Sequence, residues 1–224
     1  MNRILKLAAA AAVLAAAAGS ADAGTLEFRF IGNEAFEITD GETTLFTDFP
    51  YRPGYAGYMY YGLREVKRRA DSLCLITHRH LDHFDPNLMK RVECTVVGPE
   101  EVTGQLFGNE FLPLEEEIRF RTLTIRPIRT QHGELEHYSY LVTWHGLKLF
   151  FTGDTTDYDA VMRVDGIDVL FVTPWVARKI LKQDLPIPGK KKVIYHHRGR
   201  GVMPGCGECL WPKQGDGFQL TTAK

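Results

Sequence analysis

The sequence Thr-His-Arg-His-Leu-Asp-His at residues 77–83 determines how the rest of the chain is interpreted. The apolar run before it, residues 73–77, predicts a buried strand, and the Asp-Pro pair at 85–86 predicts a helix that begins with an N-cap and a proline. A mixture of imidazole and carboxylate groups suits zinc, manganese or iron. The loop therefore presents four candidate metal ligands: His78, His80, Asp82 and His83.

The composition describes an ordinary globular chain. Its 224 residues are 44% hydrophobic, which is enough for one domain with a substantial core. The formal net charge is −1. Binding to a phosphate backbone requires a basic field, so we expect no nucleic-acid partner.

The first 23 residues predict a secretory signal peptide. Arg3 and Lys6 precede an apolar run at residues 7–18, and Ala21-Asp22-Ala23 is a typical cleavage pattern. The run is too short to span a bilayer comfortably, although an uncleaved anchor is the alternative. We expect residues 24–224 to form the exported domain, in the periplasm or secreted. It contains no further segment for stable membrane insertion.

Hydrophobic patterning predicts an α/β fold. Apolar and polar residues alternate over 26–31, and further strands are expected at 36–38 and 43–47. Later strands are expected within 118–128 and at 138–143, 147–152, 168–173 and 193–195, and helices at 63–70, 86–92, 102–107 and 175–185. Residues 51–62 combine five tyrosines with three glycines and no regular period, which favours a loop.

The pattern His-x-His-x-Asp-His resembles the signature of the metallo-β-lactamase superfamily. Thr152-Gly153-Asp154, after an apolar strand, resembles a second motif of that family, and the similarity extends from about Leu26 to the end of the chain. Among its branches, the chain is most similar to the one that includes the ascorbate-6-phosphate lactonase. The resemblance implies an αββα sandwich and a hydrolase that uses two divalent metal ions.

The resemblance also implies the remaining ligands. His132, after a strand, fits the third histidine of the first site, and His137 is its competitor or a substrate contact. Asp154 would bridge the ions, and the last ligand would be His197, with His196 as the alternative. Asp48 would orient a ligand histidine or serve as a turn residue. The first ion would be held by His78, His80 and His132, and the second by Asp82, His83 and His197.

This centre predicts hydrolysis by a metal-activated water. Zn²⁺ is the expected ion, with Mn²⁺ or iron as alternatives, and Asp82 and Asp154 are the expected catalytic carboxylates. Tyr58 in the tyrosine-rich loop and Arg198 are candidate contacts to a small-molecule substrate. An ester, a lactone or a phosphorylated molecule is favoured. The alternatives are a phosphodiesterase, or a non-catalytic metal- or redox-binding protein of the envelope.

Four cysteines complete the unusual features. Cys74 and Cys94 lie in apolar segments and are predicted to be buried thiols. Cys206 and Cys209 are close enough to form a disulfide in an oxidising compartment. A redox motif and a metal knuckle are the other interpretations of this pair.

Overall fold

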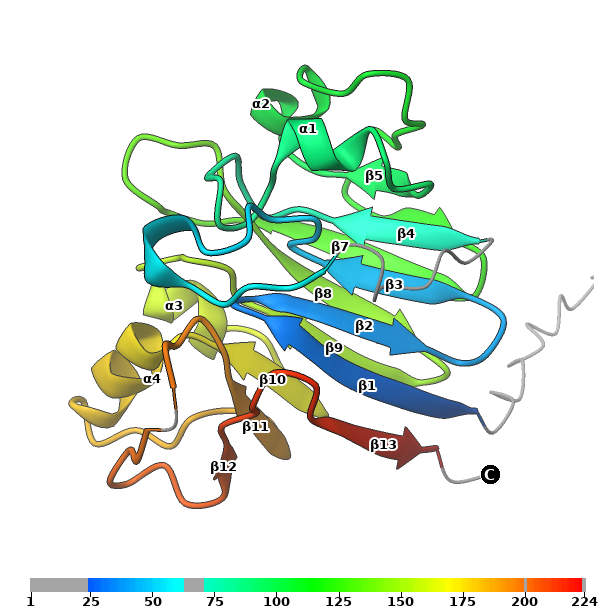
Figure 1. The fold of residues 1–224 in the computed structure, drawn as a ribbon. Coiled ribbons are helices and arrows are strands. Elements are labelled where there is room, and N and C mark those ends of the chain that lie inside the picture. Colours follow the sequence, from blue (N-terminus) through cyan, green and yellow to red (C-terminus); the bar gives the residue numbers. More distant parts are fainter. Residues whose placement is uncertain (1–23, 63–70, 200, 223–224) are drawn as a thin grey trace, which may run out of the picture.

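Two β-sheets pack face to face in the computed structural model, which describes residues 24–62, 71–199 and 201–222 (Figure 1). The expected signal peptide and the expected helix at 63–70 lie outside these residues. The first sheet has the order β13-β1-β2-β3-β4-β5. Its strands are β1 (Thr25–Gly32), β2 (Ala35–Thr39), β3 (Thr44–Thr47), β4 (Ser72–Leu75), β5 (Thr95–Val97) and β13 (Gly217–Thr221).

The second sheet has the order β12-β11-β10-β9-β8-β7-β6. Its strands are β6 (Ile118–Phe120), β7 (Leu123–Arg129), β8 (Tyr138–Trp144), β9 (Leu147–Phe151), β10 (Val169–Val172), β11 (Lys191–Ile194) and β12 (Cys209–Leu210). Both sheets are mixed: β3, β4 and β5 run parallel, as do β9, β10, β11 and β12, while the other neighbours are antiparallel.

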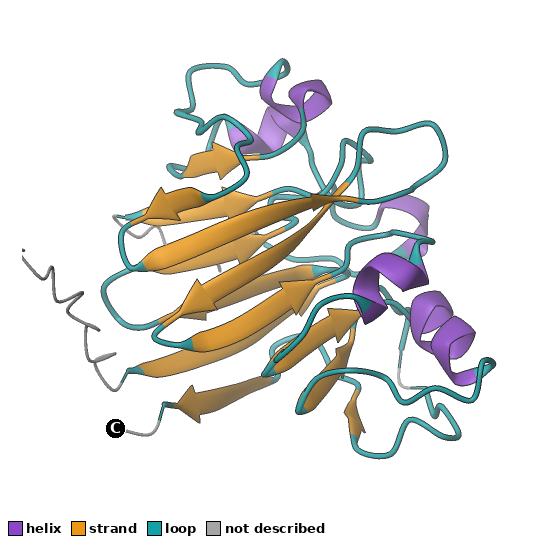
Figure 2. Cartoon of the chain, turned by 180° about the vertical axis from the view of Figure 1, so that it is seen from behind, coloured by secondary structure: helices purple, strands orange, loops and turns teal. Residues whose placement is uncertain are grey.

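Short helices lie outside the two sheets. They are α1 (Pro86–Met89), α2 (Glu100–Thr103), α3 (Tyr158–Met162) and α4 (Pro174–Leu181). Figure 1 shows α1 and α2 beside β5, and Figure 2 shows the two sheets layered one behind the other. The αββα sandwich predicted from the sequence is confirmed. Three of the expected helices exist as α1, α2 and α4, and all three are shorter than expected, whereas α3 was not predicted.

Strand alternation explains the four layers. In β10, Val169 and Phe171 pack into the core between the sheets, whereas Leu170 and Val172 pack beneath α3 and α4. On the outer face of the first sheet, Cys74 contributes to a third apolar cluster that includes residues of α1 and α2. Each central strand is therefore buried on both faces, as is typical of strands covered by sheet and helix.

Strand β13 was not predicted. It pairs antiparallel with β1 at the edge of the first sheet, nearly two hundred residues away in sequence. Phe218 stacks on Phe28 with ring centroids 4.3 Å apart. The run from Gly217 to Thr221 has only two strongly apolar residues, so its identity as a strand depends on this long-range contact.

Two disulfides link the chain, Cys74 to Cys94 and Cys206 to Cys209. The predicted Cys206–Cys209 pair is present, but the expectation of free thiols at Cys74 and Cys94 was wrong. These two cysteines lie beside each other because β4 and β5 are parallel neighbours, which brings their ends together. Their sequence separation of 20 residues gave no indication of this pairing.

Phe171 provides a test of the core between the sheets. Its ring lies 4.4 Å from that of Phe151 and 4.9 Å from that of Phe36, and the side chain is fully buried. Phe171→Ala should lower the free energy of unfolding by about 3–5 kcal/mol, because it leaves a cavity that the sheets cannot close. Urea denaturation would measure this. Val202→Ala, at a side chain that is 91% exposed, is the control and should change stability little; equal effects of the two variants would contradict this assignment of the core.

Candidate metal centre

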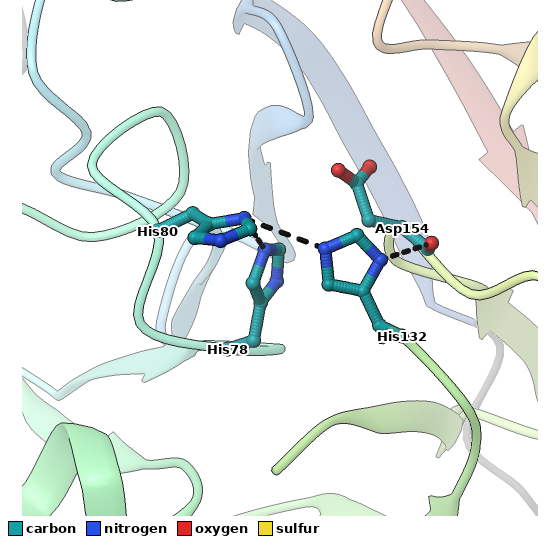
Figure 3. Close-up of side chains that lie close together, drawn as sticks. All are labelled: His78, His80, His132 and Asp154. Atoms are coloured by element: carbon teal, nitrogen blue, oxygen red, sulfur yellow. Dashed lines mark hydrogen bonds between the residues drawn. The ribbon is translucent and has the colours of Figure 1, made fainter. Parts of the chain in front are cut away.

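Three histidines and one aspartate converge where strands of both sheets end (Figure 3). One ligand atom from each of these residues lies within 4.8 Å of the others. The Nε2 atom of His78 is 2.9 Å from Nδ1 of His80, which in turn is 3.4 Å from Nε2 of His132. His80 is exposed, so solvent reaches the group. We call it the histidine cluster: His78, His80, His132 and Asp154.

Backbone contacts set the orientation of these ligands. The Nδ1–H group of His132 donates to the carbonyl of Asp154 at 2.8 Å, which leaves Nε2 free to face the cluster. Thr77, which precedes His78, donates its backbone N–H to the Asp48 carboxylate at 2.8 Å. Hydrogen bonds of this kind fix the tautomer and direction of a metal-binding imidazole.

A second group, which we call the mixed cluster, consists of Asp82, His83 and His196. The Nε2 atom of His196 lies 3.4 Å from the Asp82 carboxylate and 3.2 Å from that of Asp154. The Nε2 atom of His83 lies 3.4 Å from Asp154. Asp154 therefore faces both clusters, as expected of a shared ligand.

The charges around Asp154 show what this centre favours. Burial alone would raise the pKa of Asp154, but the charge of His83 and the nearby His196 hold it well below its usual range. The pKa of Asp82 is also lowered, because His196 and His83 outweigh the effect of burial. Both carboxyl groups are thus ionised and available to a cation at neutral pH.

His196, and not His197, lies with Asp82 and His83, so the geometry favours the alternative assignment of the last ligand. His196 has a left-handed backbone with φ of 52°. This breaks the alternation of side chains after β11, which explains why counting along the strand favoured His197. The ring of His197 instead lies 5.8 Å from Phe30 and 5.3 Å from Trp211.

His137 does not line an open surface. It is fully buried, and its Nδ1 atom lies 2.8 Å from the hydroxyl of Thr130. A Cβ atom at Gly153 would lie 2.5 Å from its Nε2, so the imidazole is packed behind this glycine. Burial, with the nearby His132, lowers the pKa of His137 to about 3 and keeps it neutral. The expectation of a substrate contact is therefore not supported.

Tyr58 and Arg198 lie next to the mixed cluster. The ring of Tyr58 meets that of His196 edge-on, with centroids 4.6 Å apart. Arg198 lies over the Tyr58 ring at 5.1 Å and donates to the carbonyl of Ala56 at 2.7 Å. As predicted, residues 51–62 form a loop, interrupted by the 3₁₀ turn η1 (Tyr55–Gly57). Tyr58, in this loop, and Arg198, after β11, therefore both lie beside the centre. These are the two expected substrate contacts.

Asp48 lies where an orienting residue is needed. Its carboxylate is 3.3 Å from Nδ1 of His83 and also accepts hydrogen bonds from Thr77. This matches the first of the two roles considered for it. The residue that sequence reasoning missed is Glu34, whose carboxylate lies 3.6 Å from the same nitrogen. The only signal was a polar Asn-Glu pair inside the apolar segment from Phe30 to Phe36.

The donors fit divalent metal ions. Buried polar atoms normally have hydrogen-bond partners, yet several here have none: both ring nitrogens of His83 and of His196, and Oδ1 of Asp154. Imidazole nitrogens and carboxylate oxygens that converge in this way are the donor set of zinc, iron and manganese sites. The histidine cluster would hold one cation and the mixed cluster a second, with Asp154 between them.

The fold and this donor set define a metallo-hydrolase architecture, and comparisons with known proteins agree. The family model described as "Beta-lactamase superfamily domain" matches residues 27–185. The chain therefore belongs to the β-lactamase superfamily. A search of curated proteins finds no match.

Solved structures share the fold at low sequence identity. A metallo hydrolase from the archaeon Ignicoccus hospitalis is 15% identical with a TM-score of 0.66, covering 88% of this chain and 98% of that one. An isothiocyanate hydrolase from Delia radicum gut bacteria is 14% identical with a TM-score of 0.64, covering 88% and 100%. The metallo-β-lactamase fold protein YhfI of Bacillus subtilis is 12% identical with a TM-score of 0.60, covering 88% and 100%.

Asp154 is the residue on which the paired arrangement depends. Asp154→Asn removes the only carboxylate that faces both clusters among the described residues. The variant should therefore bind fewer metal ions per chain than the wild type. Elemental analysis after dialysis against a weak chelator would measure this, with the exposed Asp165→Asn as control. Equal metal content in the two variants would exclude Asp154 as a ligand.

Proposed function

We propose that this protein is an exported hydrolase that uses two divalent cations, with Zn²⁺ expected ahead of Mn²⁺ or iron. Its substrate would be an ester, a lactone or a phosphorylated small molecule. The observation that carries this proposal is the convergence of two groups of metal-binding side chains, from segments far apart in sequence, around Asp154. Membership of the superfamily supports it.

Different side chains of the site would have different roles in this hydrolysis. Bound divalent cations lower the pKa of a water molecule and polarise the carbonyl or phosphoryl oxygen of the substrate. The low pKa of Asp82 keeps it ionised, so it can accept a hydrogen bond from the attacking water and orient it. His132 is held by the Asp154 carbonyl, so its Nε2 atom remains directed at the centre.

Tyr58 and Arg198 would form the substrate side of the site. Arg198 is exposed, and the contacts it makes with the Tyr58 ring and the Ala56 carbonyl hold it beside the mixed cluster. A guanidinium group has five N–H donors, so the bond to Ala56 leaves others for an anionic group. This supports a carboxylated or phosphorylated substrate over a neutral one.

Export from the cytoplasm is part of the proposal. The charged, apolar and small-residue sections of residues 1–23 support it. Disulfides persist in oxidising compartments, and the chain has two. Among the described residues, none forms a helix with the length and hydropathy required to cross a bilayer. We propose the periplasm or the exterior as its location.

Metal content and turnover, measured together, test the proposed function. The purified protein should contain two divalent ions per chain and hydrolyse members of a panel of esters, lactones, phosphodiesters, phosphomonoesters and isothiocyanates. Removal of the ions with a chelator should abolish turnover, and added Zn²⁺ or Mn²⁺ should restore it. A chain that holds two ions but cleaves nothing in the panel would favour the non-catalytic binding protein.

Arg198 gives a test of the substrate class. Arg198→Gln should raise KM for an anionic substrate by about 10- to 100-fold, the loss expected for a charge-assisted hydrogen bond. Turnover of a neutral ester should change little. The exposed Arg163→Gln is the matched control. If both substrates are affected equally, Arg198 acts by holding the loop at Ala56 and not by binding the substrate.

A further inference from the structure

Glu34 is a buried carboxylate without a hydrogen-bond donor. It lies in the turn between β1 and β2, has no exposed surface, and neither of its carboxylate oxygens receives a hydrogen bond. A buried and unpaired carboxylate is costly unless a positive charge lies nearby. Such a group therefore either destabilises the fold or takes part in the adjacent metal centre.

The turn that presents Glu34 is tied to the mixed cluster. The Asn33 side chain donates to the carbonyl of Asp82 at 2.5 Å, and the backbone carbonyl of Asn33 accepts the backbone N–H of His196 at 2.7 Å. The carbonyl of Glu34 accepts the hydroxyl of Thr47 at 2.9 Å. Asn33 adopts a left-handed φ of 53°, which asparagine tolerates better than most residues. Glu34 is thus held in a defined place relative to two candidate ligands.

His83 lies between two pairs of carboxylates. On one side its Nε2 atom faces Asp82 at 3.8 Å and Asp154 at 3.4 Å. On the other side its Nδ1 atom faces Asp48 at 3.3 Å and Glu34 at 3.6 Å. A histidine that binds metal through one nitrogen usually donates its other N–H to a carboxylate or carbonyl, which fixes the ring and its tautomer.

Asp48 and Glu34 are not equivalent as acceptors for this N–H. Asp48 already receives the backbone N–H of Thr77 at 2.8 Å and the Thr77 hydroxyl at 3.0 and 3.1 Å. Glu34 has no such competing donor. Its carboxylate is therefore available to His83. Burial and the charge of Asp154 raise the pKa of Glu34 well above its usual value, so a cation in the mixed cluster would favour the ionised carboxylate.

We propose that Glu34 is a positioning residue of the metal centre: together with Asp48 it faces the Nδ1–H group of His83 so that Nε2 points at the mixed cluster, and its carboxylate strengthens cation binding there. This inference depends on the two-metal centre of the proposed function. It assigns to Glu34 a role centred on the second cation, because the nitrogen that it faces belongs to His83. Glu34 also lies within 4.8 Å of Asp154, which both clusters share.

Glu34→Gln separates this role from a structural one. The amide has the same shape but no charge, so the metal-free variant should melt at the same temperature as the wild type or higher. Its affinity for the second Zn²⁺ should fall by about 10- to 100-fold, the usual effect of removing such a partner. Affinity for the first Zn²⁺ should fall much less, because Asp154 is the one member of the histidine cluster that is grouped with Glu34. Competition with a chromophoric chelator would give both constants.

Two further variants complete the experiment. Glu34→Asp retains the charge and should bind the second Zn²⁺ more tightly than Glu34→Gln does. Glu42→Gln, at an exposed position in the next turn, is the control and should behave as the wild type.

The outcomes distinguish the inference from the proposed function. If the wild type binds no metal, the proposed function fails, and the inference fails with it. If the wild type binds two ions and Glu34→Gln binds both with unchanged affinity, only the role of Glu34 is excluded. A metal-free Glu34→Gln protein that melts well below the wild type would show that Glu34 supports the fold, and would also overturn the inference.

Discussion

The concentration of buried acidic and imidazole groups between two apolar sheets is the constraint on which this structure depends. Charged groups removed from water are costly unless they are paired or bind a cation. Here Glu34, Asp48, Asp82 and Asp154 are all buried around His83. A sandwich with so large an apolar core tolerates this cluster only at one end, where the strands stop and loops supply side chains.

Parallel strands bring these loops together. Asp48 follows β3, residues 77–83 follow β4, Asp154 follows β9 and His196 follows β11. Because β3 and β4 run parallel, and β9, β10 and β11 do too, their carboxyl ends meet at common edges of the two sheets. Side chains that are distant in sequence thus become neighbours through strand direction alone. In other α/β folds, ligands also bind at the carboxyl ends of parallel strands.

Much of this could be predicted from the sequence, but only where the determinants are local. The metal loop and the Thr-Gly-Asp turn each follow an apolar strand, and both were located correctly. Spacing favoured His197 over His196, because it does not reveal that a left-handed backbone at His196 reverses the side-chain direction. Glu34 and the Cys74–Cys94 disulfide depend on which segments pair in space, and the strand β13 depends on its contact with β1. These features have no local signature.

The electrostatics of the two clusters are opposite, although both draw on one seven-residue loop. Burial and the charge of His83 hold the pKa of His78 well below its usual value. Burial should do the same to His83, yet the carboxylates of Asp154 and Asp48 raise its pKa well above that value. His78 is therefore a neutral ligand in the histidine cluster, whereas the mixed cluster lies in a field that attracts positive charge. A cation at the mixed cluster would gain from this field, and one at the histidine cluster would rely on coordination bonds. Two chemically different positions around one shared aspartate would allow the proposed hydrolase to bind a substrate and a water molecule separately.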